Sequence, residues 1–279
     1  MKKTLVLTII GLSILLSSCK SEFEKIRASG DVDRIYKQAL AYYDNEEYQK
    51  AQTLFELVIS SFRGKREAEE IYYKYAYTYY KLEQYILASY YFKNFANTYA
   101  ASDLREEAEF MSAYSNYQLS PTFRLDQKYS EEAIDGFQLF INTFPNSERV
   151  AECNRLIDVL RKKLEHKAYE SALLYFDLRE YQAAIQSFDN VLKDFPDTEN
   201  GEQIRYMSIR SAYLLAKNSF VEKQKERFEE AESRASEFLA RYPDSRFKKE
   251  AANIYEQSTE FLKKSDNVRY QNESARAGS

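Results

Sequence analysis

Residues 180–198, EYQAAIQSFDNVLKDFPDT, contain an apolar pattern that recurs along the chain. Counting from Ala184, apolar residues follow four, seven and eleven positions later, at Phe188, Val191 and Phe195. These spacings place the side chains on one face of a helix. Pro196 comes next, and a proline followed by polar residues ends one helix and favours the start of another. The stretch therefore predicts the second helix of a helix-turn-helix unit.

The same pattern occurs five times. Its anchoring alanines are Ala51, Ala88, Ala133, Ala184 and Ala231, and prolines follow the third, fourth and fifth copies at Pro145, Pro196 and Pro243. A second set of alanines lies upstream at Ala39, Ala76, Ala113, Ala172 and Ala212. In the third and fifth copies the two alanines are 20 and 19 residues apart instead of twelve, which predicts extra residues between the paired helices. Tyr42, Tyr79 and Tyr175 stand three residues after their alanines and are predicted to pack between helices.

This is the tetratricopeptide pattern, a helix-turn-helix of about 34 residues whose small residues let helices approach and whose apolar faces are covered only by stacking. We therefore predict an all-α superhelical solenoid of about five tetratricopeptide repeats over residues 31–264. The predicted repeats are about 32–68, 69–105, 106–160, 165–200 and 204–248, followed by an end helix. Residues 19–30 are expected to form a tether and the polar residues 265–279 a disordered tail.

Composition excludes several classes of function. The formal net charge of the 279-residue chain is −4, so no basic excess is available to neutralise nucleic acid. The two cysteines, Cys19 and Cys153, and the one histidine, His166, form no zinc-binding cluster. We found no nucleophile beside His166 and no phosphate-binding glycine loop, and we interpret the acidic pairs at helix starts, such as Glu69-Glu70 and Glu106-Glu107, as solvated faces. The sequence thus predicts no catalytic or metal site and no cofactor.

The N-terminus predicts a lipoprotein signal. Lys2 and Lys3 precede an apolar run over 5–16, which is too short to span a membrane and fits a secretory signal peptide over 1–18. The run ends in Leu16-Ser17-Ser18-Cys19, which resembles the bacterial lipobox. That resemblance implies cleavage before Cys19 and attachment of a covalent lipid to its thiol. Removing Lys2 and Lys3 with the signal would bring the formal charge to −6.

The first helices of the repeats carry an unusual number of aromatic residues. Counting from the repeat alignment, groove-facing positions are occupied by Tyr36, Leu40, Tyr43, Tyr73, Tyr77, Tyr80, Phe110, Tyr114, Tyr117, Tyr169, Leu173 and Phe176. Tyrosine offers a large contact area at low entropic cost together with a hydroxyl group. We predict that Tyr36, Tyr43, Tyr73, Tyr77, Tyr80, Phe110, Tyr114 and Tyr117 form a groove for an extended or unfolded polypeptide. The alternative is that many of them only pack between helices.

The chain as a whole resembles the BamD family of outer-membrane lipoproteins. The lipobox, the five repeats and the third-repeat segment LSPTFRLDQKYSEEAIDGFQLFINTFPNSERV (119–150) carry this resemblance. It implies a non-enzymatic subunit of the β-barrel assembly (BAM) complex, anchored in the outer membrane and facing the periplasm. The implied partners are the periplasmic domains of a BamA-like barrel subunit, other BAM lipoproteins and unfolded outer-membrane proteins. We place the partner surface at Phe123, Arg124, Asp126 and Gln127.

Other interpretations remain open at this stage. Another lipid-anchored tetratricopeptide scaffold for cell-envelope assembly would carry the same repeats. A SusD-like nutrient-binding lipoprotein would be longer and would use tryptophan to stack on sugars, whereas this chain has none. Acidic residues after the lipidated cysteine, Glu22 and Glu24, favour export to the cell surface in some bacteria, so surface exposure is the alternative to a periplasmic location.

Overall fold

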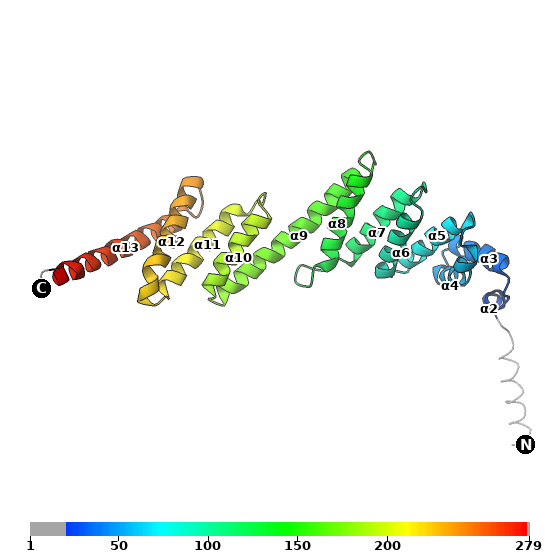
Figure 1. Ribbon diagram of the computed structural model, residues 1–279, viewed down its shortest axis with the longest axis horizontal. Coiled ribbons are helices and arrows are strands. Elements are labelled where there is room, and N and C mark those ends of the chain that lie inside the picture. The colour runs from blue at the N-terminus through cyan, green and yellow to red at the C-terminus, as the bar shows by residue number, and fades with distance from the viewer. Residues whose placement is uncertain (1–20, 278–279) are drawn as a thin grey trace, which may run out of the picture. The chain divides into compact units, whose positions relative to one another are not determined.

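The computed structural model describes residues 21–277 (Figure 1), all of whose regular elements are helices. The helices are α2 (Glu22–Arg27), α3 (Val32–Asp44), α4 (Tyr48–Val58), the 3-10 helix η1 (Ile59–Phe62), α5 (Glu67–Lys81), α6 (Tyr85–Thr98), α7 (Arg105–Leu119), α8 (Lys128–Thr143), α9 (Val150–Asp177), α10 (Tyr181–Asp194), α11 (Gly201–Lys217), α12 (Val221–Arg241) and α13 (Lys248–Ala277). The predicted fold class, an all-α stack of helix pairs, is confirmed. None of the described helices is long and apolar enough to cross a bilayer.

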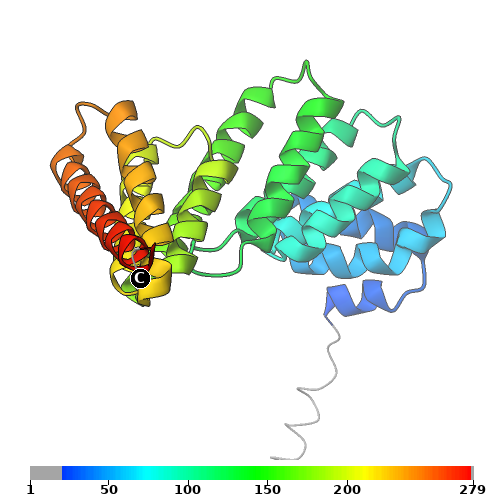
Figure 2. The same cartoon turned by 60° about the vertical axis from the view of Figure 1, so that its left-hand side comes forward.

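The chain divides into two compact units. Unit 1 runs to Pro121 and resumes over Asp126–Leu160, and unit 2 comprises Thr122–Leu125 and the residues from Arg161 onward. In unit 1, the pairs α3/α4, α5/α6 and α7/α8 stack in chain order (Figure 2). In unit 2, α10 packs on α11, α11 on α12, and α12 on α13.

The repeated apolar positions form the cores of the units. The five anchoring alanines are completely buried, and so are the residues four positions later, Phe55, Phe92, Phe137, Phe188 and Ala235. The residues seven positions later, Val58, Phe95, Phe140, Val191 and Phe238, are at most 2% exposed. Small side chains allow close helix approach, most clearly where Gly136 of α8 meets Ala113 of α7. The helical periodicity in the sequence therefore identified the buried face correctly.

Three of the turns inside pairs share one geometry. Glu46, Glu83 and Arg179, each just after the first helix of a pair, adopt positive φ angles of 61°, 58° and 64°. This left-handed conformation reverses the chain in a few residues. The third pair instead has an eight-residue connection over 120–127, where extra residues were predicted. In the fifth pair the extra residues lengthen α12 rather than the turn, because α12 begins ten residues before Ala231.

Three predictions about the segments require correction. The expected tether contains α2, whose buried Ile26 and whose Phe23, edge-on to Tyr42 at 5.8 Å, dock it on α3. The predicted disordered tail is helical to Ala277, because α13 meets no proline or glycine before Gly278. The predicted boundary between repeats three and four, at 160–165, lies inside α9, a continuous helix of 28 residues that contains neither breaker.

Tyr175 also differs from expectation. Tyr42 and Tyr79 are buried as predicted, whereas Tyr175 is 43% exposed. It lies in the part of α9 that opens unit 2. No earlier helix pair of that unit is present to cover it, so the packing position has no partner helix there.

Candidate protein-binding face

The predicted groove residues lie on the first helices of the three pairs of unit 1. Tyr36 and Tyr43 are on α3, Tyr73, Tyr77 and Tyr80 on α5, and Phe110, Tyr114 and Tyr117 on α7. All except Phe110 are partly exposed. We call the partly exposed seven the tyrosine face. Of the remaining positions named in the alignment, Leu40 is also partly buried in unit 1, and Tyr169, Leu173 and Phe176 are partly buried in unit 2.

Ring contacts hold the tyrosine face in place. The ring of Tyr77 packs edge-on against Phe92 of α6 with centroids 4.9 Å apart, and the ring of Tyr73 meets Phe92 at 6.3 Å. Tyr80 on α5 reaches Tyr114 on α7 at 6.4 Å, so the aromatic contacts continue from one pair to the next. The rings thus pack against the core while the residues remain partly exposed. This arrangement can bind apolar or aromatic side chains with little loss of rotamer entropy.

Glutamates of the following helix pair accept hydrogen bonds from the tyrosine hydroxyls. Tyr36 Oη donates to Glu70 Oε2 at 2.9 Å, and Tyr77 Oη donates to Glu107 Oε1 at 2.7 Å. Burial, together with the hydrogen bond to Glu70, raises the pKa of Tyr36 to about 12. Arg149, just before α9, forms an ion pair with the other carboxylate oxygen of Glu107. These contacts join successive pairs and orient the rings.

Phe110 does not belong to the accessible face. Its side chain is 2% exposed and packs against Phe137 and Phe140, with ring centroids 5.9 Å away in both cases. The Arg149 guanidinium covers its ring at 4.2 Å from the centroid. The prediction that Phe110 contacts a partner was therefore wrong. The Phe110 ring lies in the core because two phenylalanines of α8 and the Arg149 guanidinium cover it.

The four residues of the predicted partner surface fall in both units and differ in exposure. Phe123 and Arg124 fall in unit 2, where Phe123 contacts the His166 ring at 4.3 Å and its carbonyl oxygen accepts a hydrogen bond from Lys167 Nζ at 3.1 Å. Asp126 and Gln127 fall in unit 1. Arg124 and Asp126 are exposed, but Gln127 is only 4% exposed and accepts a hydrogen bond from Ser130 Oγ at 2.8 Å, so it cannot contact a partner.

Neither reactive side chain singled out in the sequence has a catalytic environment. His166 is exposed on α9 and contacts Phe123. Cys153 is completely buried, and burial raises the pKa of its thiol to about 11, which keeps it protonated and unreactive near neutral pH. Within residues 21–267, no cluster of three or more His, Cys, Asp or Glu side chains is placed to hold a metal ion. Cys19, the predicted lipidation site, lies outside the described residues.

A set of clasps between neighbouring repeats was missed by the sequence analysis. In the turns that follow α6, α8, α10 and α12, a serine or threonine hydroxyl donates to a glutamate of the preceding first helix. The four clasps are Ser102–Glu69, Ser147–Glu106, Thr198–Glu165 and Ser245–Glu202. Each hydroxyl also accepts a backbone N–H two residues later. The glutamates interpreted as solvated at 69 and 106 are thus structural. The recurrence of Pro-[Asn/Asp]-[Ser/Thr] was the signal for three of the four hydroxyls, whereas Ser102 follows two alanines.

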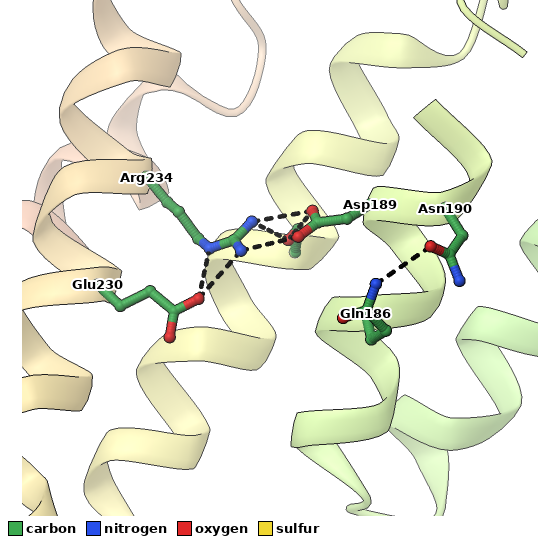
Figure 3. Close-up of polar contacts among 6 residues, drawn as sticks. Gln186, Asp189, Asn190, Glu230 and Arg234 are labelled. Atoms are coloured by element: carbon green, nitrogen blue, oxygen red, sulfur yellow. Dashed lines mark hydrogen bonds and ion pairs between the residues drawn. The ribbon is translucent and has the colours of Figure 1, made fainter. Parts of the chain in front are cut away.

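A second missed feature is an arginine cluster in unit 2 (Figure 3). Arg234 of α12 reaches across α11 to Asp189 of α10, with two N–O distances of 2.8 and 2.9 Å, and its Nε donates to Glu230 at 3.0 Å. Its Nη1 also donates to Ser208 of α11 at 3.0 Å. The cluster therefore ties three consecutive helices together. Arg234 occupies the repeat position held by Gly136 in the third repeat, which is the one signal the alignment offered.

Fold and face together define the class of protein: a tetratricopeptide-type helical-repeat protein with a surface suited to polypeptide binding. Within this class the chain belongs to the YfiO family of outer membrane lipoproteins, the BamD family, whose model matches residues 29–207. The resemblance noted in the sequence is confirmed by this match.

Two solved structures are similar to the chain at low identity. One is a Podosopora anserina kinesin light chain with nearly identical TPR-like repeats, aligned over 81% of this chain and 100% of its own, at 13% identity and a TM-score of 0.32. The other is the Rap conjugation gene regulator of plasmid pLS20 in complex with the Phr* peptide, aligned over 89% of this chain and 69% of its own, at 14% identity and a TM-score of 0.32. No curated protein matches the chain.

Proposed function

We propose that this lipoprotein is a subunit of a β-barrel assembly complex, in which it binds the periplasmic domains of a BamA-like subunit and receives unfolded outer-membrane proteins. In this proposal it acts without catalysis and is held on the periplasmic side of the outer membrane by lipid on Cys19. Family membership supports the outer-membrane setting. The tyrosine face is the single observation that supports polypeptide binding.

The face suits an unfolded chain for physical reasons. An unfolded outer-membrane protein presents apolar and aromatic side chains in an extended backbone, and the half-exposed rings of Tyr73, Tyr80 and Tyr114 offer matching contacts. Because neighbouring rings already fix these side chains, binding costs little additional entropy. Binding through rings, rather than through a closed pocket, would tolerate many sequences.

The proposal is tested with a fluorescent peptide that corresponds to the C-terminal strand of an outer-membrane protein. We expect Tyr80→Ala combined with Tyr114→Ala to weaken peptide binding at least tenfold, because both accessible rings that span α5 and α7 are lost. Tyr77 is left intact because its hydrogen bond to Glu107 supports the fold. Tyr90→Ala is the matched control, since Tyr90 is 59% exposed on α6 and outside the tyrosine face. Equal affinity of the double variant and the control would refute the role of the face.

The partner is tested separately by purifying the protein from membranes in mild detergent and identifying what accompanies it. A large barrel subunit with periplasmic repeat domains, recovered in near-equal amount, is the expected result. Recovery of a different envelope complex instead would favour the other lipid-anchored scaffold. The two experiments are independent, so peptide binding can fail while the complex assignment stands.

A further inference from the structure

A cavity of about 600 Å³ lies in unit 2 between α10, α11 and α12. Three arginines contribute to its wall, Arg205 from α11 and Arg234 and Arg241 from α12, together with the acidic residues Asp189 and Glu237. Its volume is in the range of small-ligand sites. The distribution of charge among these five residues determines what it can bind.

The charge of Arg234 is already satisfied. Its guanidinium meets both carboxylate oxygens of Asp189 and one of Glu230, as Figure 3 shows. A planar, two-bonded pair of this kind is the strongest form of arginine–carboxylate contact. Asp189 is therefore committed to Arg234 and is not available to neutralise the other two arginines.

Arg205 and Arg241 lack such partners. Arg205 Nη1 donates to the backbone oxygen of Gly201 at 3.1 Å and to Tyr242 Oη at 3.2 Å, both uncharged groups. The exposed Arg241 holds its guanidinium over the Tyr242 ring, 5.8 Å from the ring centroid. In the described part of the chain, no carboxylate oxygen comes within 4.0 Å of either guanidinium. Glu237 is the one remaining acidic residue of the wall, and its carboxylate accepts a hydrogen bond from Ser233 at 3.3 Å.

The rest of the wall is apolar, apart from one hydroxyl. Leu192, Ile209 and Phe238 line the cavity, and the hydroxyl of Ser208 is held by its hydrogen bonds to Asp189 and from Arg234. A ligand that fits must therefore combine an anionic group with an apolar one. The guanidinium groups of Arg205 and Arg241, which come from different helices, can donate to several oxygens of a tetrahedral phosphate.

We propose that this cavity binds a phosphate group through Arg205 and Arg241, with apolar atoms attached to that phosphate lying against Leu192, Ile209 and Phe238. Two sources share this chemistry, a phospholipid headgroup and free phosphate. Family membership places the protein at a membrane, where phosphate-bearing lipids are abundant. The cavity between α6, α7 and α8 of unit 1, of about 550 Å³, is lined by Glu109, Glu132 and Asp135 together with Lys93 and Lys128 and by no arginine, so the fold alone does not create an arginine-lined site.

The test uses the chain without its predicted signal peptide and measures binding calorimetrically. The probes are dihexanoylphosphatidylglycerol below its micelle concentration, inorganic phosphate, and hexanoate as a carboxylate of similar length. We expect Arg205→Gln and Arg241→Gln each to weaken binding of the lipid at least tenfold. Glu237→Gln should strengthen it about threefold, because it removes the remaining negative charge of the wall. Arg246→Gln is the control, since Arg246 contacts Gln203 and Phe247 and does not line the cavity.

The binding results distinguish a phospholipid headgroup from free phosphate as the ligand. Arginine-dependent binding of the lipid, with much weaker binding of inorganic phosphate, assigns a lipid headgroup. Arginine-dependent binding of both with equal affinity assigns free phosphate. Absence of binding, binding unchanged in both arginine variants, or equally tight binding of hexanoate would overturn the proposal. Thermal melting of every variant establishes that a loss of binding is not a loss of fold.

Discussion

At the scale of single residues, the clasps explain why the turn between repeats ends in serine or threonine. Ser147 Oγ donates to Glu106 at 2.6 Å and accepts the backbone N–H of Arg149 at 3.1 Å. One hydroxyl thus begins a helix and binds the preceding repeat. Serine and threonine are interchangeable for this purpose, and Thr198 makes the equivalent pair of contacts.

We predict that Ser147→Ala lowers the free energy of unfolding by about 1–2 kcal/mol, because a helix start and a hydrogen bond to a carboxylate are lost together. Ser147→Thr should retain most of the stability, since threonine provides the same hydroxyl. Urea denaturation of both variants and the parent measures this difference. If alanine and threonine were equally destabilising, the clasp would contribute nothing and crowding at the turn would be the cause.

At three of the four clasps the sequence indicated a helix start at the proline and its polar followers, but it did not indicate the glutamates that the hydroxyls bind. The motif Pro-[Asn/Asp]-[Ser/Thr] is local, so its role at a helix start follows from short-range rules. The glutamates lie 33 to 43 residues earlier, at separations that change with the length of the intervening insert. Phe110 was misjudged for the same reason, since its burial depends on Phe137, Phe140 and Arg149, which only the folded chain brings to it.

At the scale of elements, helix periodicity predicted the buried faces, whereas the lengths of helices depended on where breakers occur. Residues 150–177 contain no proline or glycine, and a single helix results although the repeat alignment placed a boundary there.

The close packing of α7 on α8 depends on Gly136, a residue that the repeat alignment did not single out. An added Cβ on Gly136 would lie 2.8 Å from Ala113 Cβ and 3.2 Å from Ala113 Cα.

We therefore predict that Gly136→Ala is net destabilising by up to about 2 kcal/mol. Overpacking costs about 1–3 kcal/mol, while alanine gains about 1 kcal/mol over glycine inside a helix. Ala113→Gly in the same chain should relieve the collision, so the double variant should be more stable than the sum of the two single changes implies. Chemical denaturation of the four proteins completes the cycle. Additive effects would show that α7 and α8 do not meet closely at this point.

At the scale of the whole molecule, the tyrosines with raised pKa values are unevenly distributed between the units. Burial is the main cause of the increase at ten tyrosines in unit 1, namely Tyr36, Tyr43, Tyr48, Tyr73, Tyr75, Tyr77, Tyr79, Tyr80, Tyr85 and Tyr99. Unit 2 has three, Tyr169, Tyr206 and Tyr213. In the folded state these groups hold their protons at pH values where the unfolded chain, with an ordinary tyrosine pKa of about 10, begins to release them.

This distribution predicts that alkaline pH unfolds unit 1 before unit 2. A pKa raised by folding contributes stability that is complete below pH 10 and is lost as the pH rises through the folded value, which is about 12 for Tyr36. Lysine deprotonation acts on both units over the same range, so the difference between them reports on the tyrosines. Limited proteolysis between pH 9 and pH 11.5, with the fragments assigned by mass, should show cleavage within residues 31–119 at lower pH than within residues 181–241. Replacing Tyr36, whose hydroxyl is paired with Glu70, by phenylalanine should make the stability of unit 1 less dependent on pH between 10 and 12, because the group that titrates there is removed. Simultaneous cleavage of both units, or earlier cleavage of unit 2, would show that tyrosine burial does not set the alkaline limit of this fold.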